Sequence, residues 1–386
     1  MIEQKRLGDI ATYINGFAFK PEDRGTVGLP IIRIQDLTGN AYDLGFYAGN
    51  YPERIEINDG DVLISWSASL GVYVWDKGKA LLNQHIFKVV FDKCEVNREY
   101  FVYAVRYKLK EMESKTHGAT MKHIVKKDFD NTLIPFPTLE EQENIANLLD
   151  KISTIILVRQ QQLQKLDELV KARFVELFGD PVGNPKAYYV ATLQELICKG
   201  YITYHLDGNH GGDYPKSDEF VETGIPYISA NCIVNGEVDF AKAKYLTSER
   251  ANKLRKGIAQ NGDVLFAHNA TVGPTVVLHT TEKKVILGTS LTAYRCDKEK
   301  ILPNYLKTYM LSDGFVRQYS NEMKQTTRNQ VPITAQKKYL FLIPPIELQN
   351  QFATFVEQVD KSKVAVQKSL DEAQLLFDSL MQQYFG

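Results

Sequence analysis

Two short segments of the chain gather positively charged side chains, although the formal net charge of all 386 residues is only -1. Residues 106–127 hold seven Lys or Arg against two Glu, a local net charge of +5. Residues 317–338 hold five Lys or Arg against one Glu, a local net charge of +4. Either cluster alone is equally well explained as a solvated helix face. Two clusters at equivalent places favour a shared role, and grouped cations contact nucleic-acid phosphates.

Short runs of amide, hydroxyl and imidazole side chains follow predicted strands or turns in both halves of the chain. Such side chains read base edges by hydrogen bonding, with Arg favouring guanine and Asn favouring adenine. We therefore expect DNA contacts from one set of residues in each half. These are Ser65, Ser67, Gln84, His85, Lys115, Thr116, Thr120, Lys122 and His123 in the first half, and Asn209, His210, Tyr214, Asn269, Thr271, Thr327, Arg328 and Asn329 in the second. His210 has a second interpretation, as a turn residue that holds its own loop.

Several short catalytic motifs are missing from the sequence. It has no Gly-x-x-x-x-Gly-Lys-Ser/Thr loop for ATP and no His-Glu-x-x-His zinc motif. It also has no Asn/Asp-Pro-Pro-Tyr/Phe run of the kind that adenine methyltransferases use. Its four cysteines stand far apart, which fits reduced thiols better than a disulfide framework or a zinc site. We expect no catalysis, no metal and no cofactor; the alternative is a nuclease or methyltransferase in its own right.

The elements that position these residues are indicated by an internal repeat whose copies lie 207 residues apart. Pro137 matches Pro344, and the match continues until Phe178-Gly179 pairs with Phe385-Gly386. Within each copy, mostly apolar residues recur at alternating steps of four and three, from position 145 to 177 and from 352 to 384. This heptad pattern predicts two long helices, each about 60 Å in length, whose narrow apolar seams need a partner helix. The alternative is a pair of ordinary amphipathic core helices.

Upstream of each predicted helix lies a region rich in β-forming residues and bounded by turn residues. Gly60-Asp61-Val62-Leu63 in the first region matches Gly262-Asp263-Val264-Leu265 in the second, which indicates diverged copies. The sequence therefore predicts an α+β tandem repeat. Its β-rich parts, called head 1 and head 2, are expected at residues 1–137 and 180–345, and its long helices, at 138–179 and 346–386, are expected to pack as an antiparallel coiled coil.

The residues that open each predicted helix resemble those of a known family. They look like the conserved-region starts of type I restriction-modification specificity (S) subunits, and the resemblance spans the whole chain. The matching runs are Ile134-Pro135-Phe136-Pro137-Thr138-Leu139-Glu140-Glu141-Gln142 and Ile343-Pro344-Pro345-Ile346-Glu347-Leu348-Gln349, and the heads add Gly118-Ala119-Thr120-Met121-Lys122-His123-Ile124 and Asp207-Gly208-Asn209-His210-Gly211. One departure is Gln325-Thr326-Thr327-Arg328-Asn329-Gln330, which stands where a Gly-Ser-Thr-like loop is expected.

The resemblance implies that the heads are target-recognition domains, each reading one half of a split double-stranded DNA target. It also implies that the helices set the distance between the half-sites, that two methyltransferase subunits dock on the helical regions, and that restriction subunits join the complex. The chain itself is then a non-catalytic specificity subunit. We also expect it in the cytoplasm, because the sequence shows no long apolar stretch and no charged-then-apolar signal-peptide pattern. The alternative is a coiled-coil scaffold with two protein-binding heads.

Overall fold

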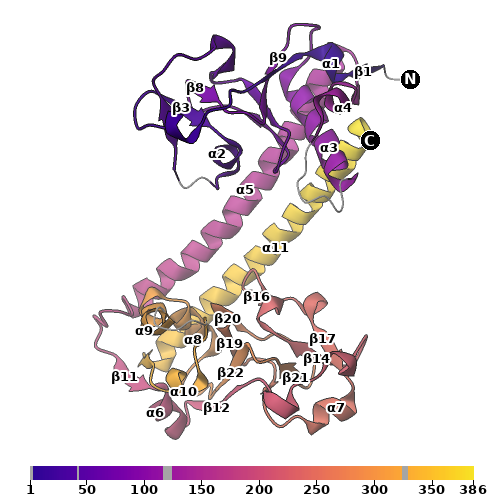
Figure 1. Cartoon of the computed structure of the whole chain (residues 1–386). Coiled ribbons are helices and arrows are strands. Elements are labelled where there is room, and N and C mark those ends of the chain that lie inside the picture. Colours follow the sequence, from indigo (N-terminus) through magenta and orange to yellow (C-terminus); the bar gives the residue numbers. More distant parts are fainter. Residues whose placement is uncertain (1–2, 41–42, 116–123, 324–328) are drawn as a thin grey trace. The chain divides into compact units, whose positions relative to one another are not determined.

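The computed structural model describes residues 3–40, 43–115, 124–323 and 329–386. The chain forms two compact units. Unit 1 consists of residues 1–160 and 367–386, and unit 2 consists of residues 161–366. Each unit therefore contains one β-rich head together with a part of each long helix (Figure 1).

The described residues of unit 1 form two four-stranded sheets and one strand pair. The first sheet is antiparallel, in the order β2 (Thr12–Asn15), β9 (Ile86–Val90), β6 (Val62–Ser65) and β7 (Gly71–Val74). The second has the order β4 (Gly45–Tyr47), β3 (Leu29–Ile32), β8 (Ala80–Leu82) and β5 (Glu56–Ile57), with β3 and β8 parallel. Strand β1 (Gln4–Arg6) pairs with β10 (Leu133–Pro135), and the helices are α1 (Leu7–Ile10), α2 (Ile34–Thr38), α3 (Arg98–Lys115) and α4 (Lys126–Asp130).

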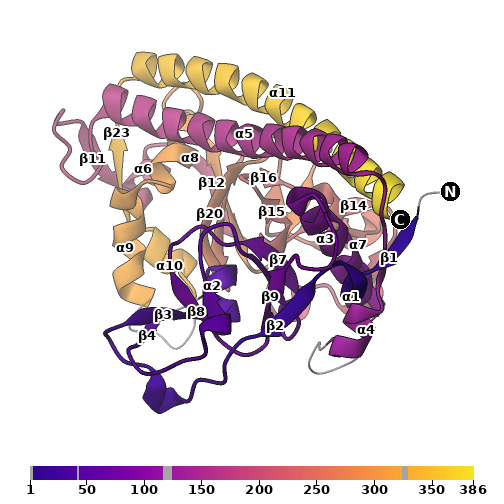
Figure 2. The same ribbon diagram turned by 90° about the horizontal axis from the view of Figure 1, so that it is seen from above.

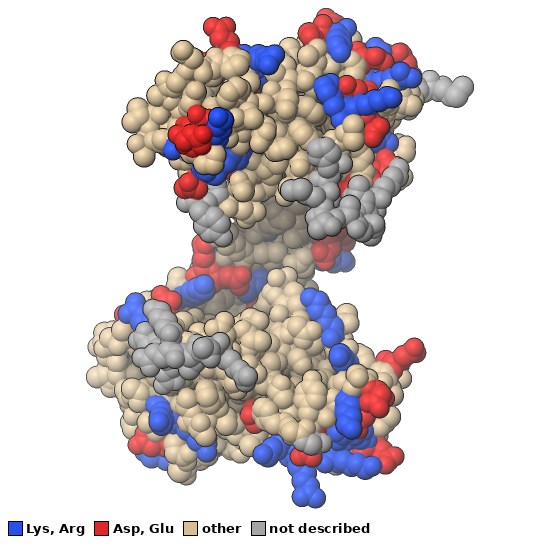
Figure 3. Space-filling view, in the orientation of Figure 1, with Lys and Arg blue, Asp and Glu red and all other residues tan. Residues whose placement is uncertain are grey.

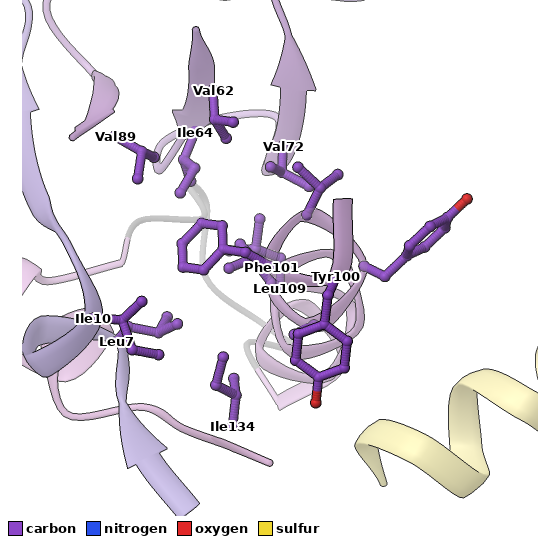
Figure 4. Close-up of a cluster of buried hydrophobic side chains, with 14 of the residues drawn as sticks. Leu7, Ile10, Val62, Ile64, Val72, Val89, Tyr100, Phe101, Leu109 and Ile134 are labelled. Atoms are coloured by element: carbon purple, nitrogen blue, oxygen red, sulfur yellow. The ribbon is translucent and has the colours of Figure 1, made fainter. Parts of the chain in front are cut away.

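The main core of unit 1 lies where the first sheet meets α3. Alternate residues of β6 and β9 point toward this helix because successive strand side chains face opposite sides. Figure 4 shows Ile64 and Val89 of the sheet in one cluster with Phe101 of α3 and Ile10 of α1. The same cluster includes residues from both ends of the chain, so it joins the head to the long helices.

Unit 2 repeats this layout with longer connections. Its first sheet has the order β12 (Ile202–Asp207), β22 (Leu291–Cys296), β19 (Val264–Asn269) and β20 (Thr271–Val277). Its second has the order β13 (Phe220–Val221), β17 (Lys244–Leu246), β14 (Ile225–Ile228), β21 (Val285–Leu287) and β18 (Ile258–Ala259). The unit also has two strand pairs, β11 (Tyr189–Thr192) with β23 (Leu340–Ile343) and β15 (Ile233–Val234) with β16 (Glu237–Val238). Its described shorter helices are α6 (Leu193–Cys198), α7 (Ser248–Lys253), α8 (Pro303–Met310), α9 (Asp313–Met323) and α10 (Ile333–Gln336).

The two heads share the same strand pairings, which confirms that they are diverged copies. In each first sheet, one inner strand pairs with the next strand along the chain and with the last strand of that sheet, as β6 does with β7 and β9. The parallel pair of β3 with β8 corresponds to that of β14 with β21. Gly60 and Gly262, which open the matching Gly-Asp-Val-Leu motifs, also share a left-handed backbone, with φ angles of +92° and +90°, a region that suits glycine.

Helices α5 (Leu139–Phe178) and α11 (Ile346–Phe385) correspond to the two predicted long helices. Every predicted seam position in both helices is buried or partly buried. In unit 1, Phe385 near the end of α11 shares a core with Leu149 near the start of α5. In unit 2, Phe174 and Phe178 at the end of α5 each lie 5.5 Å from the ring of Phe352 at the start of α11. Within each unit the two helices are therefore antiparallel and lie side by side (Figure 2).

A buried glutamine fixes the start of each long helix to its head. Gln349 is fully buried, its side-chain oxygen accepts from the Leu302 backbone N–H at 2.9 Å, and its Nε2 donates to the Pro344 carbonyl at 2.9 Å. Gln142, 207 residues earlier, makes the same pair of bonds to Asn97 and Pro137. These bonds satisfy backbone groups that the nearby prolines and helix termini leave unpaired.

Replacing Gln349 by leucine is expected to destabilise unit 2 by about 1–3 kcal/mol, because the Leu302 N–H and the Pro344 carbonyl lose their partner while remaining buried. Urea denaturation of the variant checks this. The matched control is Gln351→Leu, which changes an exposed glutamine on the same helix and should leave the unfolding midpoint unchanged. Equal midpoints for both variants would contradict the proposed role of the buried amide.

Candidate nucleic-acid interface

Head 1 brings distant segments together at one end of its first sheet. The Trp66 backbone N–H, just beyond β6, donates to the His85 carbonyl at 3.2 Å. The Ile124 N–H, which follows residues 116–123, donates to the Trp66 carbonyl at 2.9 Å. The Gln84 N–H donates to the Phe17 carbonyl at 2.9 Å. We call this junction, formed by residues 17, 65–69, 83–85 and 124, edge 1.

Head 2 builds the same junction from equivalent backbone bonds. The His268 N–H donates to the Ser290 carbonyl at 2.9 Å, and the Val331 N–H donates to the His268 carbonyl at 2.8 Å. The Ala270 N–H donates to the Asn329 carbonyl at 3.0 Å, which extends the contact by two residues. We call this junction, formed by residues 267–271, 288–290 and 329–331, edge 2. In both heads a residue within the basic cluster, Ile124 or Val331, therefore hydrogen-bonds to the end of an inner strand of the first sheet.

Both edges contain residues in the left-handed backbone region. Ala68 in edge 1 and Ala270 in edge 2 are equivalent and have φ angles of +59° and +65°. His85 in edge 1 has a φ angle of +72°. Such conformations strain a residue that carries a Cβ and cluster at functional sites. The repeated strain marks these two turns as positions where backbone geometry matters.

Edge 1 contains four of the predicted DNA-contacting residues. Ser65 is fully buried, and its hydroxyl donates to the Ser69 carbonyl at 2.6 Å, so it closes the turn after β6. Ser67 is also buried, whereas Gln84 is exposed. The half-buried ring of His85 lies 5.0 Å from that of Trp66, and its Nδ1 has no hydrogen-bond partner among the described residues.

Edge 2 contains three predicted residues, Asn269, Thr271 and Asn329, which lie on facing segments. The other three described residues of this head lie after β12. Asn209 is buried and donates from Nδ2 to the Lys256 carbonyl at 2.8 Å, and Tyr214 is exposed. His210 lies 2.7 Å from an Asp207 oxygen through its Nε2, a contact that favours its second interpretation as a turn residue. For all of these side chains, contact with DNA stays a prediction.

The remaining predicted contacts, Thr116, Thr120, Lys122, His123, Thr327 and Arg328, and the side chain of Lys115, lie outside the described residues. The described cations of the two basic clusters are mostly exposed, and they include Arg106, Lys110, Lys127, Arg317, Lys337 and Lys338. On the face seen in Figure 3, Lys and Arg stand in small groups near Asp and Glu rather than in a continuous basic layer. Basic charge is therefore local on this face, as the sequence predicts.

A buried polar network beneath edge 2 was missed by the sequence analysis. Gln336 of α10 is fully buried, and its Oε1 accepts from the Tyr294 hydroxyl at 2.6 Å and lies 3.1 Å from Nε2 of His205. Its Nε2 donates to the Val331 carbonyl at 3.2 Å. Trp66 and His268 occupy equivalent positions, because each lies six residues after the glycine of its Gly-Asp-Val-Leu motif. This difference in residue type was the one sign in the sequence that the two heads differ chemically here.

Burial lowers the pKa of His205 to about 4, with Lys337 and His268 acting in the same direction and Gln336 and Asp207 opposing them. The unfolded chain therefore binds this proton first as pH falls below the ordinary histidine value of about 6.5. The contribution to stability is present above that pH and is lost as pH falls toward 4, with a slope of at most about 1.4 kcal/mol per pH unit.

We expect the substitution His205→Tyr to flatten the pH dependence of unit 2 unfolding in urea. Tyrosine is the residue at the equivalent position of head 1, Tyr13. Equal slopes for variant and parent would contradict this.

Within the part of the chain that the structure describes, no group of three His, Cys, Asp or Glu side chains is arranged to hold a metal ion. No helix among the described residues is both long and apolar enough to cross a membrane.

A family model described as the type I restriction modification DNA specificity domain matches the chain twice, over residues 2–168 and 205–373. The chain is 23% identical to the type I restriction enzyme EcoBI specificity subunit of Escherichia coli over 397 aligned residues, which cover 97% of this chain and 83% of the relative. It is also 23% identical to the MjaVIII specificity subunit of Methanocaldococcus jannaschii, with coverage of 80% and 74%.

Solved structures share the fold over nearly the whole chain. The S subunit of a type I restriction-modification system from M. genitalium superposes with a TM-score of 0.59 at 17% identity, covering 100% of this chain and 96% of that one. A chain from a study of complex assembly and conformational transition of the type I R-M system superposes with a TM-score of 0.56 at 18% identity, covering 99% and 97%.

Proposed function

The chain belongs to the family of type I restriction-modification DNA specificity subunits, and from this premise we propose that each head reads one half of a split double-stranded DNA target through its edge. As a specificity subunit, the chain is a non-catalytic part of a complex that contains methyltransferase and restriction subunits. It contributes the position of the complex on DNA. Catalysis belongs to the partner subunits, and methylation of an adenine requires the base to leave the helix.

The observation that carries this proposal is the duplication of one edge with different side chains. Two backbone bonds of edge 1, from Trp66 to His85 and from Ile124 to Trp66, recur in edge 2, whereas the residues that the edges hold differ, as with Ser67 and Asn269. A constant framework that presents variable polar residues is what two related readers of different sequences require. Phosphate contacts from the neighbouring basic clusters would fix the register without choosing a sequence.

The proposed function is tested by co-expressing the chain with the methyltransferase subunit of its own operon and mapping methylated adenines on DNA. We expect a split motif with an unread gap. Absence of both a complex and a motif would support the alternative of a scaffold with protein-binding heads.

Apolar side chains exposed at equivalent positions of the two long helices support two docking sites for one kind of partner. Leu157 and Val364, which lie 207 residues apart, are 54% and 67% exposed. Leu169 and Leu376 have the same spacing and are 47% and 51% exposed. Isolated exposed apolar residues are common on protein surfaces, but their repetition at equivalent positions favours a repeated contact. We propose that two methyltransferase subunits bind here, one for each copy.

Changing Leu157 to glutamate is expected to remove one methyltransferase subunit from the complex, and changing Leu157 and Val364 together is expected to remove both, because a buried unpaired carboxylate opposes docking. Native mass spectrometry of the co-purified complexes counts the subunits. The control pair, Gln160→Glu and Gln367→Glu, introduces the same charge at exposed positions that are also equivalent. Loss of both subunits from the single variant would argue against independent, equivalent sites.

A further inference from the structure

The two heads fill the space beneath their edges with side chains of different chemistry. The equivalence of the positions follows from strand register, since His205 pairs with Tyr294 as Tyr13 pairs with Val89, and Phe266 pairs with Thr292 as Ile64 pairs with Phe87. It also follows from spacing along the chain, because Phe129 lies five residues after Ile124 and Gln336 lies five residues after Val331. The equivalent pairs are Tyr13 with His205, Phe87 with Thr292, Trp66 with His268, and Phe129 with Gln336.

In head 1 these positions form an aromatic cluster. The buried ring of Phe129 meets that of Tyr13 edge to face at 4.9 Å and lies 5.9 Å from Phe87. Trp66 stacks on Phe87 at 5.5 Å, and its Nε1 donates to the Asn15 side-chain oxygen at 3.3 Å. Apolar packing therefore supports edge 1 from below. Contacts between apolar side chains depend less on the exact orientation of the groups than hydrogen bonds do.

In head 2 the same positions form the hydrogen-bond network centred on Gln336. Besides its bond to the Val331 carbonyl, Nε2 of Gln336 donates to the Thr292 hydroxyl at 3.1 Å. Because Oε1 of Gln336 can only accept, Nε2 of neutral His205 must carry the proton that points toward it. The Nδ1 atom of His205 is then an unprotonated acceptor, and it has no partner among the described residues. Both polar atoms of the Gln336 side chain thus have hydrogen-bond partners that fix their orientation.

The network ends on one residue of edge 2, Val331. The Val331 carbonyl lies 3.2 Å from Nε2 of Gln336 and 3.1 Å from Nδ1 of His268, and the Val331 N–H donates to the His268 carbonyl at 2.8 Å. Two residues earlier, the Asn329 carbonyl accepts from the Ala270 N–H at 3.0 Å. Residues 329–331 are therefore held against the end of β19 by two backbone bonds and by the side-chain bonds of Gln336 and His268 to the Val331 carbonyl.

We propose that Gln336 is a positioning residue for the second half-site: it holds residues 329–331 in the orientation that head 2 needs to read DNA, without touching DNA itself. This inference rests on the proposed function of the heads. Removing the amide leaves the buried Tyr294 hydroxyl without its acceptor and leaves the Val331 carbonyl with His268 Nδ1 as its side-chain partner, and the loss of buried partners forces local rearrangement. Head 1 has no equivalent dependence, because the phenyl side chain of Phe129 makes no hydrogen bond that a substitution could remove.

The test uses the full chain in complex with its methyltransferase subunit and a DNA library that varies each half-site separately. Gln336→Met keeps a similar volume and removes both hydrogen-bonding atoms. We expect discrimination against mismatches in the second half-site to fall by about tenfold, the scale of one lost base contact, while discrimination at the first half-site stays within about twofold of the parent. The control is Gln260→Met, an exposed glutamine in the same unit, which should change neither.

A second pair of variants keeps the test decisive if Gln336→Met does not fold. His268→Asn retains a donor near the Nδ1 position, whereas His268→Leu removes it. We expect the asparagine variant to preserve second half-site discrimination better than the leucine variant, which a purely space-filling role of His268 does not predict. Unchanged discrimination in Gln336→Met, or an equal loss at both half-sites, overturns the inference. If the parent complex shows no split motif at all, it is the proposed function that fails.

Discussion

Replacing Gly16 by alanine is expected to abolish recognition of one half-site and leave the other intact. A Cβ on Gly16 would lie 2.0 Å from the Asn83 carbonyl oxygen, a backbone atom next to Gln84 and His85 of edge 1. Because no side-chain rotation can relieve this overlap, edge 1 must shift. Each base pair that is no longer read forfeits about 1–3 kcal/mol, so loss of a half-site lowers cognate DNA binding by at least about 100-fold. Residual methylation should ignore the sequence of that half-site.

The same change in the other head provides the mirror experiment. Gly208 is the equivalent residue, and its Cβ would lie 2.1 Å from the Gly288 carbonyl oxygen. Gly208→Ala should therefore erase only the second half-site. Gly25→Ala is the control within head 1, since its Cβ would meet the Phe46 carbonyl oxygen at an ordinary 3.6 Å. If Gly16→Ala relaxed both half-sites together, the division of recognition between two edges would be wrong.

The long helices could be predicted from sequence because their pattern is local. A heptad stripe needs only residues three and four apart to show which face is buried, and each predicted seam position is indeed covered. The start of each helix was also visible, because Pro137 and Pro344 restrict the backbone that precedes it. The buried face of each long helix could thus be predicted without knowing how the heads fold.

The edges could not be predicted as assemblies, because they depend on contacts between distant segments. A single offset of 207 residues aligns Ile124 with Val331, but Gly16 and Gly208 are only 192 residues apart. Insertions accumulate in the loops of head 2, where they are tolerated, so the correct pairing of residues changes along the chain. Strand register recovers it, and register is a property of the folded sheet.

Residue type alone also could not show which of the candidate side chains are buried. Asn209 and Ser65 were chosen because amides and hydroxyls read bases, yet both side chains are buried and bond to nearby carbonyls. Gln336 was not chosen, because a lone glutamine outside a motif gives no signal. Its importance comes from four neighbours that the fold brings to it.

Adding one heptad to each long helix is expected to lengthen the unread gap of the target while leaving both half-sites unchanged. Seven residues extend a helix by about 10.5 Å at 1.5 Å per residue, which corresponds to about three base pairs at 34 Å per helical turn of DNA. The seven residues are inserted after Gln160 in α5 and after Val366 in α11. Because the apolar pattern also repeats every seven residues, the seam residues on both sides of each insertion stay on the same face of the helix. Methylation mapping of the resulting complex reads the gap directly.

A four-residue insertion at the same two points separates helix length from seam continuity. It adds about 6 Å to each helix but rotates the apolar stripe on one side of the insertion relative to the other, so Leu163 and Leu370 leave the seam. We expect this variant to lose stability and methylation, whereas the seven-residue variant keeps both and changes only the gap. If the seven-residue variant instead altered the bases read in either half-site, recognition would reside partly in the helices, and the assignment of sequence reading to the two edges would have to be abandoned.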